Sequence, residues 1–368
     1  MRRKRPAAAE DTLNQRFLGL ERIIIAPAGV SARFERNLNI MSRKSNPQEQ
    51  ADCTFRTRIG GQALIEGILM RGMTKQAIVV RAPDGSLVVK EEELTLIKEK
   101  YPILGLPVIR GAVSFISSMV NGVRALMFSA DFYPDDPDAA DEEPGRLDQW
   151  LEAHFSDEKL SSMVVTLAVI LGVGLSVVLF FLLPTLLGTA VTLVTDSLLV
   201  RNVAEAVLRA AIFMIYMIAC SQTKDMKRVF AYHGAEHKSI FCYERGLPLT
   251  VENVRKMPRH HPRCGTSFMV NVIIVSIIVS SIVFTYFQIR NALLRMLAHL
   301  ILLPVIVGVT YEINTWCGRT DNAVTRVLSA LGLWMQNFTT NEPDDSMIEV
   351  AVKALELVLP EEKGSDEW

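Results

Sequence analysis

The sequence predicts a mainly α-helical membrane protein, with about four transmembrane helices and a small cytoplasmic N-terminal domain that contains β-structure. Three observations support this fold class. The chain of 368 residues has a mean hydropathy of +0.24, although 21% of its residues are charged. Its apolar residues gather in four long stretches between residues 162 and 313. Ahead of these stretches, two β-branched runs flank a turn.

Four apolar stretches are long enough to cross a bilayer, and we expect each to form a transmembrane helix. They cover residues 162–187, 204–220, 267–287 and 293–313. In the first stretch, Pro184 marks the end of the helix or a kink. The second carries Arg209, which must face other helices or reach an interface, and the fourth carries His299 and ends at Glu312. Ionisable groups at this depth are candidates for function.

The distribution of Lys and Arg sets the expected orientation. The segment between the second and third stretches is rich in them: Lys224, Lys227, Arg228, Lys238, Arg245, Arg255, Lys256, Arg259 and Arg263. The connection between the first and second stretches carries little beyond Arg201. Because cytoplasmic loops carry an excess of positive residues, we expect this segment and both termini in the cytoplasm. The expected location is therefore the cell (inner) membrane, crossed several times.

The domain organisation follows from these stretches. In chain order we expect a leader (1–52), a β-rich cytoplasmic unit (53–100), a helix at the membrane interface or packed on the bundle (101–132), an acidic linker (133–160), transmembrane helices one and two (161–222), a cytoplasmic insert (223–266), transmembrane helices three and four (267–314), and a cytoplasmic tail with an amphipathic helix (315–368). The leader has no uninterrupted apolar run, which excludes a secretory signal peptide. We expect it to be disordered, or translation to start at Met41.

The β-rich unit is predicted from a hairpin signal. The runs 76–82 and 86–90 are β-branched and flank the turn Pro83-Asp84-Gly85. Ahead of them, the segment 60–72 combines four glycines with Glu66 and an arginine among apolar residues. Glu66 is therefore a candidate ligand or catalytic acid. The alternative is a bulged strand with a structural Glu–Arg pair.

The pentapeptide His233-Gly-Ala-Glu-His237 reads H-x-x-E-H and follows the second apolar stretch. No proline lies between residues 221 and 246, so the motif is expected on a helix. On a helix the imidazoles at i and i+4 share one face, with Glu236 beside them. This spacing can hold a divalent metal and a carboxylate base together. The alternative is a solvated His/Glu face without metal.

A catalytic metal site needs a further donor and an open position. The turn around residues 258–265 brings two donors back towards the motif. The candidates for a third ligand are His261, Cys264, Glu244 and Glu312, of which Glu312 lies near the cytoplasmic end of the fourth stretch. For His261 and Cys264, the alternative is a capped turn with a packed thiol. Glu236 is the candidate general base or a further ligand. Zinc is the expected divalent metal, with Mn or Fe as alternatives.

Several blocks of the sequence occur together in one order: Gly60–Gly72, Tyr232–Lys238, Leu249–Arg255, His261–Phe268, Tyr311-Glu312 and Glu342–Asp345. In these blocks the chain resembles the YqhQ-like family of bacterial membrane proteins, the domain of unknown function numbered 1385. The resemblance covers about residues 58–358 and implies a multi-pass membrane protein, described as a predicted metal-dependent enzyme. It brings no substrate. The motif also resembles that of the inverted zinc proteases, but proteolysis does not follow from a local likeness.

The leading hypothesis is metal-assisted hydrolysis of a membrane-associated substrate at the cytoplasmic membrane face. A first alternative is a non-enzymatic scaffold whose basic insert binds anionic lipid or a protein partner. A second alternative is a small ion-coupled transporter, with Glu312 and His299 on the ion path. The expected partners are the lipid bilayer and the substrate, and homo-oligomers stay open. No nucleic-acid partner is expected, because topology explains the basic residues.

Overall fold

The structure is a computed structural model that describes residues 53–94, 101–133, 157–320, 322–362 and 364–368. The predicted leader and nearly all of the predicted acidic linker lie outside the described residues.

The N-terminal part of the described chain is a four-stranded antiparallel sheet with strand order β1-β2-β3-β4. Its strands are β1 (Gly60–Leu64), β2 (Gly67–Arg71), β3 (Lys75–Arg81) and β4 (Leu87–Glu93). The predicted hairpin is confirmed, because β3 pairs with β4 in the register Arg81↔Leu87. The turn between β1 and β2 holds Glu66 at a φ of 49°, in the left-handed region.

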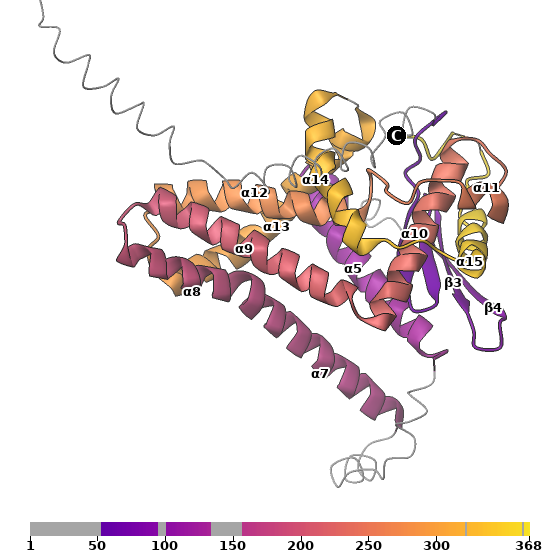
Figure 1. The fold of residues 1–368 in the computed structure, drawn as a ribbon, viewed down its shortest axis with the longest axis horizontal. Helices are drawn as coiled ribbons and strands as arrows, with labels where there is room; N and C mark the ends of the chain where they lie inside the picture. Colours follow the sequence, from indigo (N-terminus) through magenta and orange to yellow (C-terminus); the bar gives the residue numbers. More distant parts are fainter. Residues whose placement is uncertain (1–52, 95–100, 134–156, 321, 363) are drawn as a thin grey trace, which may run out of the picture. The chain divides into compact units, whose positions relative to one another are not determined.

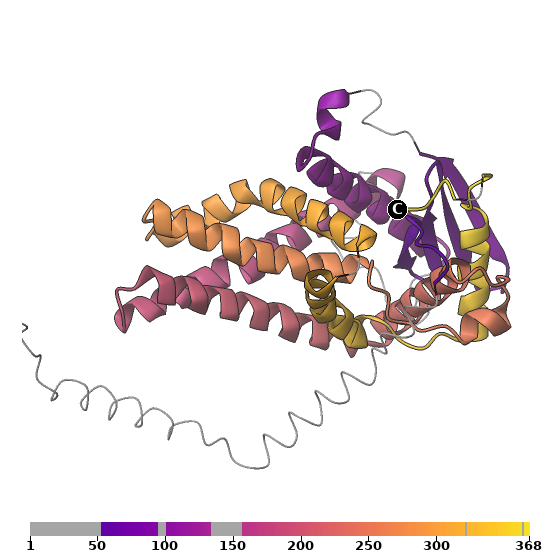
Figure 2. The same cartoon turned by 90° about the horizontal axis from the view of Figure 1, so that it is seen from above.

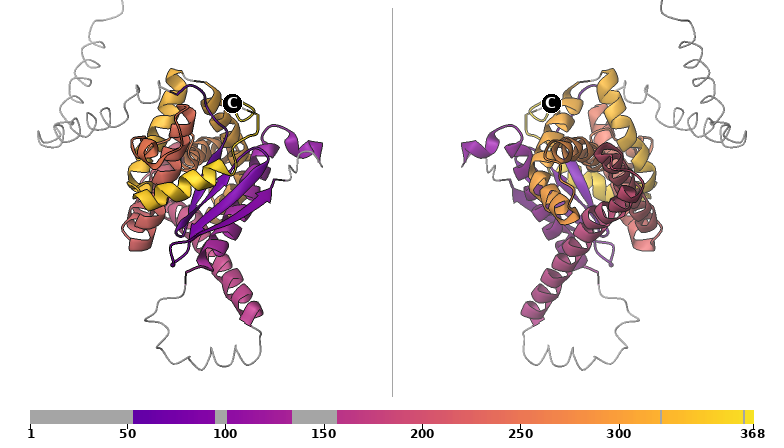
Figure 3. Two further views of the ribbon diagram at one scale, coloured as in Figure 1. Left: turned by 90° about the vertical axis from the view of Figure 1, so that its right-hand side faces the viewer. Right: turned by 90° about the vertical axis from the view of Figure 1, so that its left-hand side faces the viewer.

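The central strands β2 and β3 are buried on both faces, and different helices cover each face. Side chains alternate along a strand, so Ile68 and Met70 point to one face and Leu69 to the other. The first face packs against helices α10 (Lys224–Glu244) and α15 (Asp345–Glu356), the latter lying across the strands in Figure 3. The other face packs against α5 (Ile109–Ala130) through Ala125 and Phe128. The sheet, the insert and the tail therefore share one core.

Five helices among the described residues are long and apolar enough to cross a membrane (Figures 1 and 2). They are α5, the segment Thr166–Leu193 within α7 (Asp157–Val177), η2 (Val178–Leu182), α8 (Leu183–Ala190) and η3 (Val191–Leu193), then α9 (Leu198–Ser221), α12 (Gly265–Tyr286) and α13 (Ala292–Arg319). The chain is thus a mainly helical membrane protein. The predicted four stretches match the last four, and α5 is a further candidate.

The start of α9 differs from the predicted boundary at residue 204. Ser197 caps the helix by accepting a hydrogen bond from the backbone N–H of Val200, so the helix begins before Arg201 and Glu205. These two residues form an i,i+4 ion pair at 3.1 Å in the bundle. The predicted boundary was wrong because it treated charged residues as the end of the apolar segment, whereas pairing lets them enter the bundle.

Shorter helices complete the described chain: η1 (Pro102–Gly105), α11 (Val251–Arg255) and α14 (Ala323–Thr339). Helix α14 packs on α12 and leads through residues 340–344 into α15. The expected amphipathic helix over 345–359 is confirmed, with Ile348 and Leu355 fully buried.

Candidate metal centre

Helix α10 carries the H-x-x-E-H motif, as the absence of proline predicted. Gly246 follows the helix with a φ of 64°, a conformation that suits glycine and ends the helix. The rings of His233 and His237 lie on one face with their centroids 4.4 Å apart. The pentapeptide therefore presents two imidazoles at one place, as its spacing predicted.

A third donor reaches the His pair from another element. Cys264 is the N-cap of α12, and its sulfur accepts a hydrogen bond from the backbone N–H of Thr266. The Cys264 Sγ lies 3.1 Å from Nε2 of His233. One potential ligand atom from each of His233, His237 and Cys264 lies within 4.8 Å of the other two. Two nitrogens and one sulfur thus converge in the part of the chain that the structure describes.

Backbone carbonyls fix the orientation of both imidazoles. The Nδ1 of His233 lies 2.7 Å from the carbonyl oxygen of Thr339, and the Nδ1 of His237 lies 2.6 Å from that of Arg259. A carbonyl can only accept, so each Nδ1 carries the hydrogen and Nε2 is the atom left for a ligand. The Nε2 of His237 is buried without a protein partner. Metal-ligating histidines are commonly oriented in this way.

The carboxylate of Glu236 is held beside this cluster by the sheet. Its Oε1 accepts a hydrogen bond of 2.8 Å from the backbone N–H of Gly61 in β1. Its Oε2 is buried without a protein partner. Burial raises the pKa of Glu236 and outweighs the opposing effect of His233 and His237. One oxygen is therefore anchored and the other is available to take a proton.

The charges of the cluster are coupled. Burial opposes ionisation of the Cys264 thiol, but His233 and His237 outweigh it and hold its pKa well below the usual range. Burial likewise disfavours a charge on His233, yet the Cys264 sulfur outweighs it and raises the pKa of His233 to about 9. The two imidazoles therefore favour the thiolate form of Cys264, the form that binds metals.

The comparisons with known proteins agree on one family. Residues 106–361 match the family described as "Protein of unknown function (DUF1385)". This chain belongs to that family. It is 33% identical over 315 residues to the "Uncharacterized protein YqhQ" of Bacillus subtilis (strain 168), which covers 84% of this chain and 94% of the relative. No solved structure matches the chain. The matched residues of this DUF1385 member include all three donors of the cluster.

Two predicted third ligands lie near the cluster but face each other. The ring of His261 is 5.5 Å from that of His237, between centroids, but its Nε2 lies 3.6 Å from Oε2 of Glu244. Glu244 also accepts hydrogen bonds from the backbone N–H of Thr57 and from Arg263. Burial and the charge of Arg263 lower the pKa of His261 to about 4. His261 and Glu244 therefore contact each other beside the cluster, and the three converging donors are His233, His237 and Cys264.

The structure does not bring Glu312 or Glu66 to the His pair. Glu312 in α13 binds the guanidinium of Arg110 in α5, with Nε of Arg110 2.7 Å from Oε1. Glu66 binds the guanidinium of Arg228 and accepts a hydrogen bond of 3.0 Å from the hydroxyl of Tyr232. The interpretation of Glu66 as part of a structural Glu–Arg pair thus fits, although the partner comes from α10 rather than from its own segment.

The groups that orient the two imidazoles of the cluster and the neighbouring His261 could not be predicted from the sequence. Gln336 in α14 accepts from the backbone N–H of His261 and donates to its carbonyl, with distances of 2.7 and 2.8 Å. Thr339 and Arg259 contribute only backbone carbonyls to the imidazoles. Every residue has such a carbonyl, so no side-chain pattern marks these positions. The block Glu342–Asp345 was one of those singled out in the sequence, and its Glu342 forms an ion pair with Lys238 of α10.

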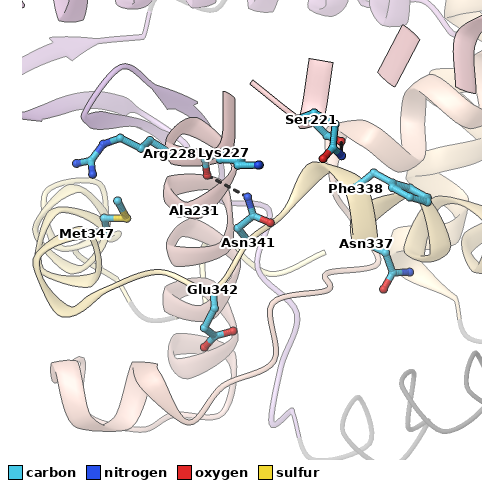
Figure 4. Close-up of a pocket in the computed structure, with 10 residues that line it drawn as sticks. Ser221, Lys227, Arg228, Ala231, Asn337, Phe338, Asn341, Glu342 and Met347 are labelled. Carbon is cyan, nitrogen blue, oxygen red and sulfur yellow. Dashed lines mark hydrogen bonds between the residues drawn. The ribbon is translucent and has the colours of Figure 1, made fainter. Parts of the chain in front are cut away.

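A pocket of about 460 Å³ lies on a different part of α10 (Figure 4). It is lined by residues from α9, α10 and the α14–α15 segment, among them Ser221, Lys227, Arg228, Phe338 and Asn341. Within it, the side-chain amide of Asn341 donates to the carbonyl of Lys227. The pocket shares no residue with the three-donor cluster, so it does not mark the candidate metal centre.

Proposed function

We propose that this DUF1385 member binds a divalent metal through His233, His237 and Cys264 and uses it for hydrolysis. The observation that carries the proposal is the convergence of their donor atoms within 4.8 Å, with both imidazoles oriented by backbone carbonyls. Two imidazoles and one thiolate suit zinc best, because hard metals such as manganese prefer oxygen ligands. Three protein ligands leave a position open, which is typical of catalytic rather than structural zinc.

Glu236 is the proposed general base. The metal would supply Lewis acidity towards a carbonyl or phosphoryl oxygen of the substrate. Oε2 of Glu236 has no protein partner and is oriented by the anchored Oε1, so it can accept the proton of an attacking water. Its raised pKa brings it closer to neutral pH, where a general base is most effective.

We infer the topology from contacts between the sheet and α10. The backbone of Gly61 binds Glu236, so the sheet and α10 lie on one side of the membrane. The chain between them must therefore cross the membrane an even number of times. The segment Thr166–Leu193 and α9 supply two crossings, which leaves α5 as a helix that does not cross. The positive residues of the insert support a cytoplasmic location for this side. The proposed substrate is a membrane-associated molecule.

The metal content of the purified protein tests the proposal. Full-length protein, solubilised in detergent and dialysed against Zn²⁺ at low concentration, should retain about one equivalent of zinc per chain by elemental analysis. His237→Ala should lose it, because the variant removes a ligand whose Nε2 has no other role. His260→Asn removes a nearby histidine that is not one of the three converging donors, so it serves as the matched control and should retain the metal. Folded wild-type protein that binds no Zn²⁺, Mn²⁺ or Fe²⁺ would overturn the proposal.

A further inference from the structure

A second polar cluster lies inside the helical bundle, apart from the metal centre. It consists of Arg201, Glu205, Arg209, Arg295 and His299, each at most 6% exposed. These residues come from α9 and α13, and all lie within the candidate membrane spans. Ionisable side chains are rare in such segments, because burying a charge in hydrocarbon costs several kcal/mol. Their presence requires a physical explanation.

The single carboxylate of this cluster is already shared between two guanidinium groups. Oε1 of Glu205 accepts from Nε of Arg201 at 3.1 Å, and Oε2 accepts from Nη2 of Arg295 at 2.9 Å. Arg295 also lies over the ring of Phe284, 4.1 Å from its centroid. Glu205 therefore has no capacity to neutralise a third cation.

Arg209 is the third cation, and the groups that accept its hydrogen bonds are neutral. Its Nε donates to the carbonyl of Phe180 at 3.1 Å. That carbonyl is available because Pro184, four residues later, has no N–H to donate, and the helix passes through a π-helical turn over Val178–Leu182. Nη1 of Arg209 donates to the hydroxyl of Ser276 at 3.3 Å.

The remaining hydrogen-bond partner of Arg209 is His299, which must be neutral, and the guanidinium also lies over the ring of Phe181, 5.6 Å from its centroid. Nη2 of Arg209 lies 2.8 Å from Nε2 of His299. A guanidinium only donates, so Nε2 accepts and the ring hydrogen is on Nδ1. This Nδ1 is buried without a protein partner. The cluster thus contains three guanidinium groups and one carboxylate, which leaves an excess of two positive charges. The Nδ1–H of His299 also has no protein acceptor.

A small cavity lies at this excess charge. Six of its lining residues are Asn202, Glu205, Arg209, Ser280, Arg295 and His299. Its volume of about 10 Å³ leaves room for a single monatomic ion or one water molecule. A phosphate, a carboxylic acid or a lipid headgroup is too large for this space.

We propose that this cavity binds one small inorganic anion of the halide class, such as chloride, between Arg209, Arg295 and His299. The anion offsets part of the excess charge. It accepts hydrogen bonds from N–H groups of these residues that have no protein acceptor, such as the Nδ1–H of His299. It would stabilise the packing of α9 against α12 and α13, because without it the guanidiniums repel one another in a medium of low dielectric constant. The site is independent of the proposed metal centre.

Chloride binding to the purified full-length protein tests this site. Protein exchanged into sodium gluconate should bind radioactive chloride saturably, with a single ion per chain. Chloride and bromide should raise the unfolding temperature relative to gluconate at the same ionic strength. Arg209→Gln should weaken binding by about 30-fold or more, because it removes a charge-assisted donor. Arg255→Gln, at an exposed pair with Asp345, should leave binding unchanged.

The chloride-binding measurement on wild-type protein is sufficient to test the proposal. The test therefore does not depend on whether the Arg209→Gln variant folds. Absence of saturable, halide-specific binding to folded wild-type protein would overturn it and assign the cavity to a water molecule. Retention of wild-type affinity by folded Arg209→Gln would also overturn it, because the ion would then bind elsewhere.

Discussion

At the scale of single residues, the candidate centre is defined by which atoms are already used. His233 and His237 have their Nδ1 atoms on backbone carbonyls, and Glu236 has one oxygen on Gly61. What is left over is one nitrogen on each ring, one carboxylate oxygen and the sulfur of Cys264. The spacing of the motif predicted the three residues on α10. Cys264 was one of four candidates, because a sequence gives the residue types near a turn but not the direction of their side chains.

The variant Glu236→Gln tests whether Glu236 is a general base or a metal ligand. The amide oxygen of glutamine can still accept the hydrogen bond from Gly61, so the variant should fold and bind one equivalent of metal. It cannot take a proton, so turnover of any chromogenic ester or phosphodiester that the wild type hydrolyses should fall about 10²- to 10⁴-fold. Glu252→Gln, on the exposed face of α11, is the control for loss of a carboxylate. Loss of the metal in Glu236→Gln would make Glu236 a ligand.

At the scale of elements, long-range pairs account for most of what the sequence could not predict. The position of Glu312 near the cytoplasmic end of its span suggested that it would converge with the His pair. Its charge is instead bound by Arg110, 202 residues away in the sequence. The spacing of Arg201, Glu205 and Arg209, each four residues from the next, was a signal in the sequence that one face of α9 is polar. The predicted start of the helix at residue 204 separated Arg201 from that face.

Gly234→Ala tests how closely α10 must approach the segment that leads into α15. A Cβ at this position would lie 2.1 Å from the carbonyl oxygen of Asn341, which is backbone and cannot rotate away. The segment must shift, and it follows Thr339, whose carbonyl orients His233. We expect the free energy of unfolding to fall by about 1–3 kcal/mol and metal affinity to fall by about 10- to 100-fold. Both are measurable by denaturation and by zinc competition with a chelator.

The control for this prediction is a second glycine beside the cluster. Gly265 follows Cys264 directly, and a Cβ there would meet nothing within 4 Å. Gly265→Ala should therefore bind metal as the wild type does and be equally stable or more stable, because alanine favours helices by up to about 1 kcal/mol. Equal metal affinities in the two variants would show that the position of the segment after Thr339 does not matter for the site.

At the scale of the whole described chain, the sheet near the start of the described residues and the helix α15 near their end share one core with α10. The hairpin and the amphipathic tail helix were predicted as separate units, since each has a local pattern. Their packing on opposite sides of a core shared with α10 could not be predicted. The apolar residues of the strands do not indicate which helix covers each face. The contact between β1 and α10 then constrains how often the chain crosses the membrane.

Thiol labelling tests this constraint on topology. In a background in which Cys53, Cys220, Cys242, Cys264 and Cys317 are replaced, single cysteines are introduced at exposed positions. Ser86→Cys in the β3–β4 turn and Lys256→Cys after α11 should react with a membrane-impermeant maleimide only in inverted vesicles. Asp196→Cys before α9 should react in intact cells, because one crossing separates it from α10. Labelling of Ser86→Cys and Lys256→Cys from opposite sides would require an odd number of crossings between sheet and insert. Helix α5 would then span the bilayer, and the contact that orients Glu236 could not form.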